Sequence, residues 1–302
     1  MIKPNALRAG DRVTVVAPAG KPDHEHLKQG IKVLENIGLE VTIGPHVFSD
    51  EEGTEAVEQQ VKDLYEAFAD PSVRGVFCAT GGFGSAKIAS LLDYEGIKKN
   101  PKIFWGYSDI TYLLNAIQKN SRLVTFHGPM VASDLNDEQR AEQTESSLSM
   151  PFIEKTMVFS DRHSSLEVLA EGEGRGHLAG GNLTLLTNGL GTPHQVDADG
   201  AVLLIEEVGE PAFLIDLKLT HLKQAGVFDS IRGVVLGNFQ VEADEEEKVS
   251  KVLRDFFAYA SFPVVKNFPF GHRQPNYGVP LGVNVKLTTS PPQLVVDSGV
   301  SG

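Results

Sequence analysis

The chain has 302 residues, of which 41% are hydrophobic, and its formal net charge is −13, from 27 basic and 40 acidic residues. This length allows a large core and about two domains, whereas the acidic balance argues against nucleic acid or an anionic membrane surface as a partner. The single cysteine, Cys78, excludes an internal disulfide framework and a cysteine-rich zinc site. Because Cys78 lies in an apolar run, we expect a buried thiol and not a catalytic one.

The beginning of the chain lacks the pattern of a secretory signal peptide, because no apolar stretch there is followed by a small-residue cleavage site. No apolar run approaches the ~18 residues that a membrane-spanning helix needs. We therefore expect a cytoplasmic protein that does not enter a membrane.

The first 130 residues alternate short β-rich runs with amphipathic helical patterns. Between the runs, one helical pattern stops at Gly38 and another at Asp70-Pro71, which are common helix ends. Alternation of this kind predicts a mostly parallel sheet covered by helices on both faces, within an N-terminal α/β domain of residues 1–130. The expected strands are 12–17, 40–43, 76–79, 102–105 and 123–126.

Residues 131–168 lose this rhythm and are rich in Asp, Glu, Gln and Ser, so we interpret them as a connector that contains one helix. The remainder, 169–302, again mixes helical and strand patterns and is expected to form a second domain. Its expected elements are helices 183–190, 213–223 and 249–257, strands 201–205 and 231–236, a strand that begins at 263–265, and a hairpin of 283–287 with 293–296.

In an open α/β sheet, binding sites form beyond the carboxyl ends of the strands. The first such end carries Gly106-Tyr107-Ser108-Asp109. A serine on a tight strand-to-helix turn would project into a cleft, where the N–H of Asp109 could stabilise an oxyanion. Serine is also a favoured helix N-cap, and Ile110 occupies the position of the second glycine in the usual nucleophile turn. This motif alone favours the cap.

The second strand end carries a glycine-rich stretch, residues 80–85 (TGGFGS). It could form a phosphate cradle, an oxyanion-hole loop that serves Ser108, or a sharp turn that needs positive φ angles. The third glycine of a dinucleotide fingerprint is missing, because Lys87 occupies its place, and no Gly-Lys-Ser/Thr follows. The pattern leaves these alternatives open.

The third strand end carries Glu206-Glu207, a pair that in many proteins is simply solvated. If Ser108 is a nucleophile, it needs a histidine base within reach and an acid that orients this base. Among nine histidines, His127 and His272 follow apolar runs in Gly/Pro-rich loops and are the best candidates. The order Ser108, Glu206, His272 is compatible with such a triad, although spacing does not establish it.

Several stretches, in the same order and across nearly the whole chain, make the sequence resemble the LD-carboxypeptidase family of serine peptidases. This family includes cytoplasmic muropeptide LD-carboxypeptidases and microcin C self-immunity peptidases. The stretches are VAPAG (16–20), GGFGSAKIASLLDY (81–94), NPKIFWGYSDITYL (100–113), LVTFHGPM (123–130), LAGGNLTLL (178–186), LLIEEVGEP (203–211) and FGHRQPNYGVPLG (270–282).

The resemblance implies a Ser108–His272–Glu206 triad, which leaves His127 a structural role near the site. It also implies a flavodoxin-like N-terminal domain, a β-rich C-terminal α/β domain, a homodimer, and catalysis without a metal or organic cofactor. For the oxyanion hole, we expect the N–H groups of Asp109 and of the loop that contains Gly81 and Gly82.

The implied activity is hydrolysis of the L,D amide bond before a terminal D-amino acid, as in murein tetrapeptide, during recycling of cell-wall peptides. One alternative is a microcin C-type immunity peptidase that cleaves an aminoacyl or peptidyl nucleotide amide. Another, of a different class, is a non-catalytic module that binds a metabolite. Three positions depart from the family pattern: Thr80 and Phe83 stand where many relatives have Arg and Tyr, and Glu207 stands where Asp is common.

Overall fold

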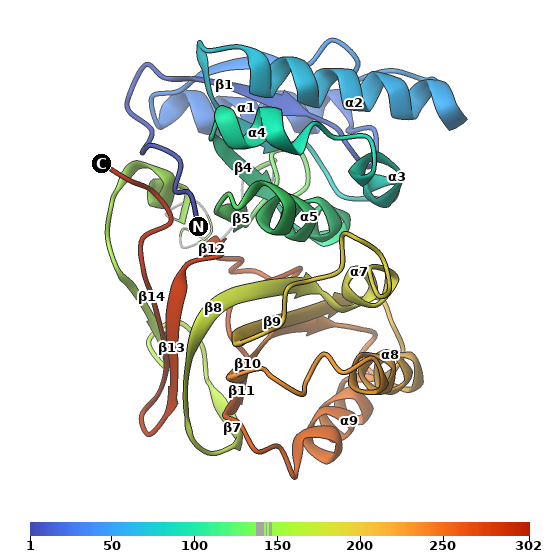
Figure 1. Ribbon diagram of the computed structural model, residues 1–302, viewed down its shortest axis with the longest axis vertical. Helices are drawn as coiled ribbons and strands as arrows, with labels where there is room; N and C mark the ends of the chain where they lie inside the picture. Colours follow the sequence, from blue (N-terminus) through green and yellow to red (C-terminus); the bar gives the residue numbers. More distant parts are fainter. Residues whose placement is uncertain (137–141, 143, 145–146) are drawn as a thin grey trace.

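The computed structural model describes residues 1–136, 142, 144 and 147–302, and two sheets with their helices lie one above the other along the longest axis (Figure 1). The N-terminal sheet contains β1 (Arg12–Val16), β2 (Glu40–Ile43), β3 (Val73–Cys78), β4 (Ile103–Gly106), β5 (Thr125–His127) and β12 (Val279–Leu281). Its helices are α1 (His24–Asn36), α2 (Gly53–Ala69), α3 (Ser85–Ala89), α4 (Tyr94–Lys99) and α5 (Thr111–Ser121), with a short 3₁₀ helix η1 (Ser108–Ile110) before α5.

The strand order of this sheet is β12-β5-β4-β3-β1-β2, and β1 to β5 are parallel. The order 2-1-3-4-5 of its parallel strands is that of flavodoxin-like sheets, so the expected N-terminal fold is confirmed. β12 adds an antiparallel edge strand beside β5. The sequence did not predict β12, a three-residue strand (Val-Pro-Leu) that comes from near the end of the chain.

The second sheet has the order β6-β14-β13-β8-β9-β10-β11-β7 and mixes parallel with antiparallel pairs. Among the described residues, helices α7, α8 and α9 accompany it, and the mixed β-rich α/β organisation agrees with the expectation. The elements are η2 (Ser147–Phe152, 3₁₀), β6 (Met157–Ser160), β7 (Glu167–Ala170), β8 (Glu173–Asn182), α7 (Leu183–Asn188), β9 (Ala201–Val208), α8 (Ala212–Gln224), β10 (Gly233–Gln240), α9 (Glu246–Phe257), β11 (Val264–Lys266), β13 (Asn284–Thr289) and β14 (Pro292–Val296).

The ten-residue strand β8 has no counterpart among the predicted elements. Its sequence, EGRGHLAGGN, contains four glycines and few residues that favour strands. The glycines have a packing reason: a Cβ on Gly176 would lie 2.0 Å from the Gly200 carbonyl oxygen, and one on Gly180 would lie 2.1 Å from that of Leu204. Close approach of neighbouring backbone therefore replaces side-chain packing along this strand.

Several predicted boundaries shift by a few residues in the structure, and one of these shifts concerns the site. Strand β9 continues through Val208, so Glu206 and Glu207 lie within the strand and not after it. After the glycine-rich stretch, the chain forms the short helix α3 and then a separate helix, α4. One helix was also expected within 131–168. Residues 137–141, 143 and 145–146 of that segment lie outside the described part of the chain. The domain boundaries at 130 and 168 stay a prediction.

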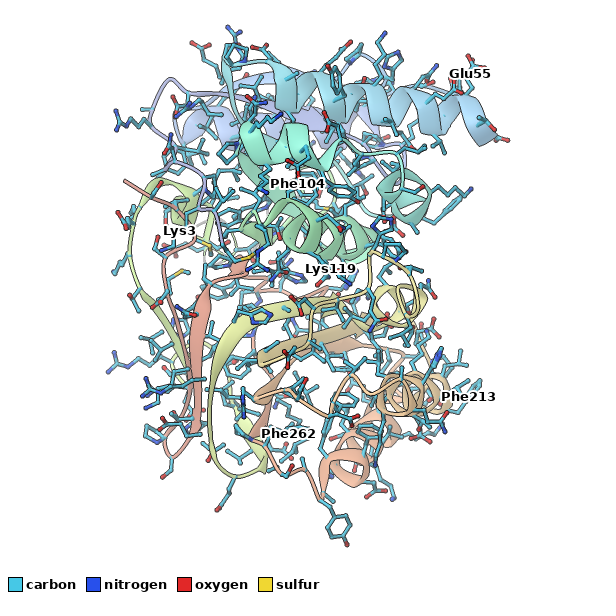
Figure 2. The ribbon with its side chains drawn as sticks, in the orientation of Figure 1. Lys3, Glu55, Phe104, Lys119, Phe213 and Phe262 are labelled. Atoms are coloured by element: carbon cyan, nitrogen blue, oxygen red, sulfur yellow. The ribbon has the colours of Figure 1, made fainter. Side chains whose placement is uncertain are left out.

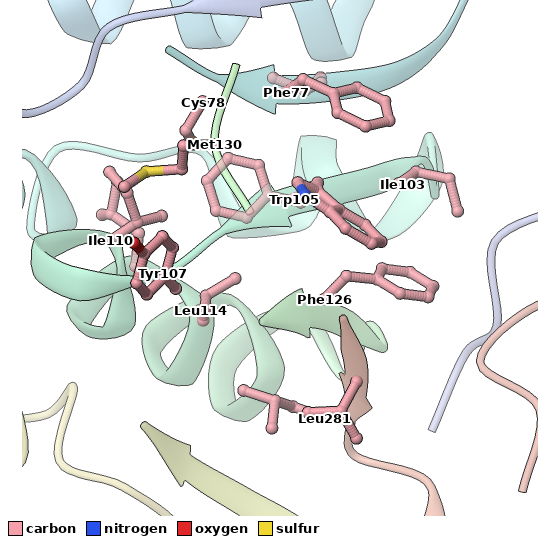
Figure 3. Packing of buried hydrophobic residues seen from close by; sticks show 14 of the residues in the cluster. Phe77, Cys78, Ile103, Trp105, Tyr107, Ile110, Leu114, Phe126, Met130 and Leu281 are labelled. Atoms are coloured by element: carbon pink, nitrogen blue, oxygen red, sulfur yellow. The ribbon is translucent and has the colours of Figure 1, made fainter. Parts of the chain in front are cut away.

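Trp105 lies on β4 in the hydrophobic core, where its ring stacks between Phe77 and Phe126 at centroid distances of 5.8 and 5.9 Å (Figure 3). Its indole N–H donates to the Pro129 carbonyl at 2.7 Å, so the buried polar atom is satisfied. Cys78 is fully buried in the same core, and this burial raises the pKa of its thiol far above the ordinary value. The thiol is therefore an inert core group, as expected.

Helix α5 lies where the two sheets meet (Figure 1), and Asn115 on this helix donates to the Gly180 carbonyl of β8 at 3.0 Å. By contrast, Phe213 projects from α8 into solvent (Figure 2) and is 69% exposed. Within the described residues, no helix is long and apolar enough to cross a membrane.

Candidate active site

Ser108 follows β4 directly and begins η1, at the turn between strand and helix. Its φ angle is +59°, in the left-handed region that a non-glycine residue adopts at a cost of about 1–2 kcal/mol. Neither η1 nor α5 has a side-chain cap hydrogen bond at its start. The capping interpretation of Ser108 is therefore wrong, and the strained backbone directs the hydroxyl elsewhere.

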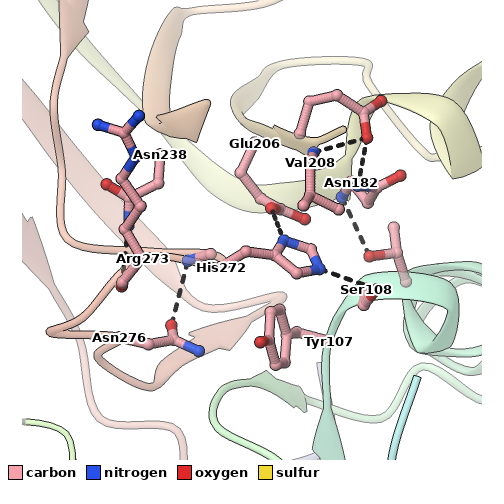
Figure 4. Close-up of polar contacts among 12 residues, drawn as sticks. Tyr107, Ser108, Asn182, Glu206, Val208, Asn238, His272, Arg273 and Asn276 are labelled. Carbon is pink, nitrogen blue, oxygen red and sulfur yellow. Dashed lines mark hydrogen bonds and ion pairs between the residues drawn. The ribbon is translucent and has the colours of Figure 1, made fainter. Parts of the chain in front are cut away.

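The hydroxyl of Ser108 contacts a histidine from the other half of the chain. His272 Nε2 lies 3.0 Å from Ser108 Oγ, and His272 Nδ1 lies 2.8 Å from Glu206 Oε2 (Figure 4). The three side chains come from the turn after β4, from β9 and from the loop after β11. The structure thus brings together the three residues that the sequence placed at separate strand and loop positions.

The proton positions on His272 follow from its partners. A carboxylate can only accept, so Nδ1 carries the proton that Glu206 Oε2 accepts. Nε2 is then free to accept the hydroxyl proton of Ser108. This is the tautomer that allows a histidine to act as base toward a serine.

Burial works to lower the pKa of His272, whose side chain is only 15% exposed. The hydrogen bond and charge of Glu206, together with the charges of Asp134 and Glu207, more than offset this effect, and the net pKa shift is upward from 6.5. The imidazolium form that appears during acyl transfer is therefore favoured by the surrounding carboxylates.

Gly237 and Gly271 pack so closely against Glu206 that a side chain at either position would collide with it. A Cβ on Gly271 would lie 2.7 Å from Glu206 Oε2, and one on Gly237 would lie 3.1 Å from Glu206 Cβ. Gly271 also has a φ of +115°, which side chains rarely adopt. This accounts for the glycine before His272: only a residue without a side chain leaves space for Glu206, which His272 contacts.

Glu207 points to the opposite face of β9, because successive side chains alternate along a strand. Its carboxylate is 2% exposed and accepts from Asn182 Nδ2, from Val208 N, and from both the N–H and the hydroxyl of Thr184. Burial raises its pKa, with the hydrogen bonds acting against that rise. Glu207 therefore fastens the β8–α7 turn and has no contact with His272.

The glycine-rich loop passes directly beside the serine. A Cβ on Gly81 would lie 3.0 Å from Ser108 Oγ, and the Gly81 carbonyl accepts from Gly20 N at 2.8 Å. Gly82 has a φ of +120°, as the sharp-turn alternative requires. Among the described residues, the N–H groups of Gly81 and Gly82 donate to no protein group. They are thus available near the hydroxyl.

The carboxylate of Asp109 points into this loop and not toward His272. Asp109 Oδ2 accepts from Ser85 N at 2.9 Å, and the Ser85 hydroxyl donates to the Asp109 carbonyl at 2.6 Å. Burial raises the pKa of Asp109, while its bonds to Ser85 and Gly84 lower it. The Asp109 side chain therefore ties the glycine-rich loop to the serine turn.

Thr80 and Phe83, two of the three departures from the family pattern, lie in this loop. Thr80 Oγ1 lies 2.7 Å from the Ser133 hydroxyl, so the position that is often Arg makes a loop-to-loop contact here. Phe83 is 78% exposed, and Lys87 Nζ lies 5.9 Å from the centre of its ring. The loop thus presents an exposed apolar ring two residues after Gly81.

Sequence reasoning missed several polar groups that surround His272. Tyr107 packs against the imidazole and donates its hydroxyl to Asp134 Oδ1 at 2.9 Å. Asn276 Oδ1 accepts from Gly271 N at 3.1 Å and so holds the histidine loop. Asp134 lies in the expected connector, whose polar composition gives no sign that this residue is buried.

His127 was the other candidate base, and it does not contact Ser108. It is fully buried, burial lowers its pKa to about 4, and neither ring nitrogen has a hydrogen-bond partner among the described residues. Its ring meets Tyr107 edge-on at a centroid distance of 5.5 Å. Among the same residues, no group of three or more His, Cys, Asp and Glu side chains could hold a metal ion.

Comparison with known proteins finds relatives that align with nearly the whole chain. A protein of Bacillus subtilis described as "Probable murein peptide carboxypeptidase" is 38% identical over 305 residues, which cover 99% of this chain and 95% of that protein. The crystal structure of an MccF-like protein from Bacillus anthracis is 26% identical with a TM-score of 0.89, covering 99% of this chain and 100% of that one. Muramoyltetrapeptide carboxypeptidase from Oxalobacter formigenes is also 26% identical, with a TM-score of 0.85, covering 96% and 100%.

Two family models match the two halves of the chain. The LD-carboxypeptidase N-terminal domain matches residues 13–128, which contain Ser108, and the C-terminal domain matches residues 175–287, which contain Glu206 and His272. Together with the full-length identity to the Bacillus subtilis protein, these matches show that the chain belongs to the LD-carboxypeptidase family of serine peptidases.

Proposed function

We propose that this protein hydrolyses the L,D amide bond before a terminal D-amino acid in murein-derived peptides, with Ser108 as nucleophile. The observation that carries the proposal is the hydrogen-bonded series from Ser108 through His272 to Glu206. The names of relatives that align over nearly the full chain, a murein peptide carboxypeptidase and a muramoyltetrapeptide carboxypeptidase, support the substrate class.

In the first step, Ser108 Oγ attacks the amide carbonyl while His272 Nε2 takes the proton of the Ser108 hydroxyl. The tetrahedral intermediate collapses as the imidazolium donates that proton to the leaving amine of the D-amino acid, and an acyl-enzyme remains. Water then attacks the ester with His272 again as base, which releases the shortened peptide and restores the serine. Glu206 keeps the imidazole in the required tautomer and stabilises the imidazolium by its charge.

The developing oxyanion would be held by backbone N–H groups. Asp109 N follows the nucleophile directly, and Gly81 and Gly82 have N–H groups without a protein partner among the described residues. Loss of one such donor typically raises a barrier by ~3 kcal/mol. A complex with a peptide aldehyde would test this assignment: we expect its oxygen within hydrogen-bond distance of Asp109 N and of the Gly81–Gly82 backbone.

The proposed substrate class goes with a cytoplasmic location, where cell-wall peptides are recycled, and with the homodimer that the family resemblance implies. Cell fractionation tests the first point, and analytical ultracentrifugation of the full chain tests the second. A monomer at micromolar concentrations would contradict the dimer without affecting the chemistry.

The decisive assay gives the purified protein murein tetrapeptide and follows release of D-alanine. Turnover by the wild type and its loss in Ser108→Ala support the proposal. A serine-directed acylating probe should label the wild type and leave Ser108→Ala unlabelled. A wild-type protein that neither releases D-alanine nor reacts with the probe would instead indicate the non-catalytic metabolite-binding alternative.

A microcin-type immunity peptidase is the second candidate, because an MccF-like protein has the same fold over 99% of this chain. A nucleotide substrate needs an aromatic ring on which its base can stack. Trp105 cannot serve, because it is fully buried, whereas the exposed Phe83 could. Parallel assays with murein tetrapeptide and an aminoacyl sulfamoyl nucleoside separate the two candidates; turnover of the nucleoside conjugate alone would overturn the murein proposal.

A further inference from the structure

Tyr107, the residue before the nucleophile, connects the imidazole of His272 to a buried carboxylate that the reaction does not otherwise use. The ring centroids of Tyr107 and His272 are 4.8 Å apart, at an interplanar angle of 54° (Figure 4). The Tyr107 hydroxyl donates to Asp134 Oδ1 at 2.9 Å. Both residues are almost completely buried, with exposed fractions of 3% and 6%.

The carboxylate of Asp134 is itself fixed. Its second oxygen, Oδ2, accepts from Met130 N at 2.9 Å. Burial raises the pKa of Asp134 above its ordinary value, and the hydrogen bonds from Tyr107 and Met130 reduce this rise without cancelling it. The Asp134 carboxylate is thus held at both of its oxygens, and one of these oxygens holds the Tyr107 hydroxyl.

We propose that Tyr107 and Asp134 form a second positioning arm for His272, independent of Glu206: the tyrosine ring supports the imidazole, and the buried carboxylate fixes the ring and adds negative charge beside it. This inference rests on the proposed function of His272 as base. Neither residue touches the reacting atoms, so both are positioning residues and not catalytic ones.

Three carboxylates act on His272 by their charge, and of these only Glu206 contacts it. Glu206 and Glu207 lie on β9, and Asp134 lies in the loop after β5; all three carboxylates favour the imidazolium form. His127, on β5, is neutral over the working range because its pKa is about 4. Asp134 therefore supplies a part of the field that neither β9 carboxylate replaces.

Three substitutions in the full-length protein separate ring, hydroxyl and charge. Asp134→Asn removes the charge and keeps one acceptor oxygen for the tyrosine hydroxyl, while its amide nitrogen faces the N–H of Met130. Tyr107→Phe keeps the ring and removes the hydroxyl bond, and Tyr107→Leu removes the ring. Asp63→Asn is the matched control, because Asp63 is equally buried at 3% exposure and binds His46 N and Nδ1 near β2.

The first readout is the titration of His272 by NMR of histidine-labelled protein, which needs no turnover. Loss of a nearby negative charge disfavours the imidazolium, so Asp134→Asn should lower the pKa of His272 by about 0.5 to 1. Asp63→Asn should leave it unchanged. An unchanged His272 pKa in Asp134→Asn would overturn the electrostatic part of the proposal.

The second readout is kinetic. Tyr107→Leu should lower kcat by about 10²-fold, the usual cost of a misplaced reacting group, with KM nearly unchanged. Tyr107→Phe should lie between this variant and the wild type. A kcat of Tyr107→Leu within twofold of the wild type would overturn the positioning role. If the wild type releases no D-alanine while Asp134→Asn still lowers the His272 pKa, the proposed function fails and the arm stands.

Discussion

Ser108 and His272 are separated by 164 positions in the chain, yet their Oγ and Nε2 atoms lie 3.0 Å apart. The serine stands on the turn after β4, in the N-terminal sheet. The histidine stands on a loop that leaves β11 of one sheet and enters β12 of the other. The contact therefore depends on how the two sheets are joined, and it can be probed from either side.

Ser108 should show a conflict between stability and activity. Its φ of +59° is strained for serine and unstrained for glycine. Both Ser108→Ala and Ser108→Gly should lower kcat by roughly 10³-fold or more, because both remove the nucleophile. Only Ser108→Gly relieves the strain, so it should unfold with a free energy up to about 1 kcal/mol higher than Ser108→Ala.

Denaturant unfolding of the two variants measures this difference directly, because the lost hydroxyl is common to both. Equal free energies of unfolding would mean that the turn adapts to alanine without strain.

Glu206 and Glu207 should differ sharply although they are neighbours. Glu206→Gln removes the partner that fixes the His272 tautomer and should lower kcat by about 10³- to 10⁴-fold. Glu207→Gln places an amide against donors that need an acceptor, which should reduce the free energy of unfolding by about 2–3 kcal/mol and have a smaller effect on kcat. Urea unfolding and steady-state kinetics on both variants check this division; a Glu207→Gln variant with the larger kcat loss would reverse the assignment.

The pH dependence of kcat/KM should follow the His272 pKa, which the carboxylates raise above 6.5. The base must be neutral, so the rate should fall as pH decreases through that raised value. The same shift stabilises the fold below pH 6.5, and this contribution is lost as pH rises through the folded-state pKa. A rate that stays flat from pH 5 to 8 would exclude His272 as the base.

In Glu206→Gln, burial still disfavours the charged imidazole while the main opposing charge is gone. The acid limb of its residual activity should therefore move to lower pH than in the wild type. A limb that stays in place would show that Glu206 does not set the pKa of His272.

Gly81→Ala tests how closely the glycine-rich loop fits the nucleophile. The new Cβ would lie 3.0 Å from Ser108 Oγ and 3.2 Å from Ser108 Cβ, so the serine must shift by a few tenths of an ångström. We expect kcat to fall by about 10- to 100-fold, with little change in Tm. Gly189→Ala is the control, because its Cβ meets its nearest atoms at 3.5 Å. Equal kcat values in the two variants would contradict the close fit.

The five parallel strands of the N-terminal sheet were predictable because they are short β-rich runs that alternate with amphipathic helices. Strand β8 was not, since its pairing rests on backbone contacts at Gly176 and Gly180 and not on side-chain pattern. β12 was missed for a related reason: three residues that include Pro280 carry no periodic signal. The edge of the N-terminal sheet, beside β5, determines where β12 forms.

The three residues of the candidate triad were predictable from the sequence, whereas the polar groups around them were not. Motifs near strand ends indicated Ser108, Glu206 and His272, and the family resemblance grouped them. The pairing of Tyr107 with Asp134 depends on two loops that converge only in three dimensions, and nothing in the local sequence of Asp134 distinguishes it from a solvated aspartate. Polar groups that serve a site through burial are in general invisible to pattern analysis.

Because β12 belongs to the N-terminal sheet, the two halves of this chain cannot be freely combined with the halves of a relative. A hybrid that joins the first half of this chain to the second half of a relative would receive a foreign strand beside β5, and the backbone pairs of Val279 with His127 and of Leu281 with Thr125 would have to form anew. The histidine loop is the segment that leads into that strand. In such a hybrid, the pairing of β12 with β5 must succeed whatever linker joins the two halves. We therefore expect the two halves of the chain to change together in evolution.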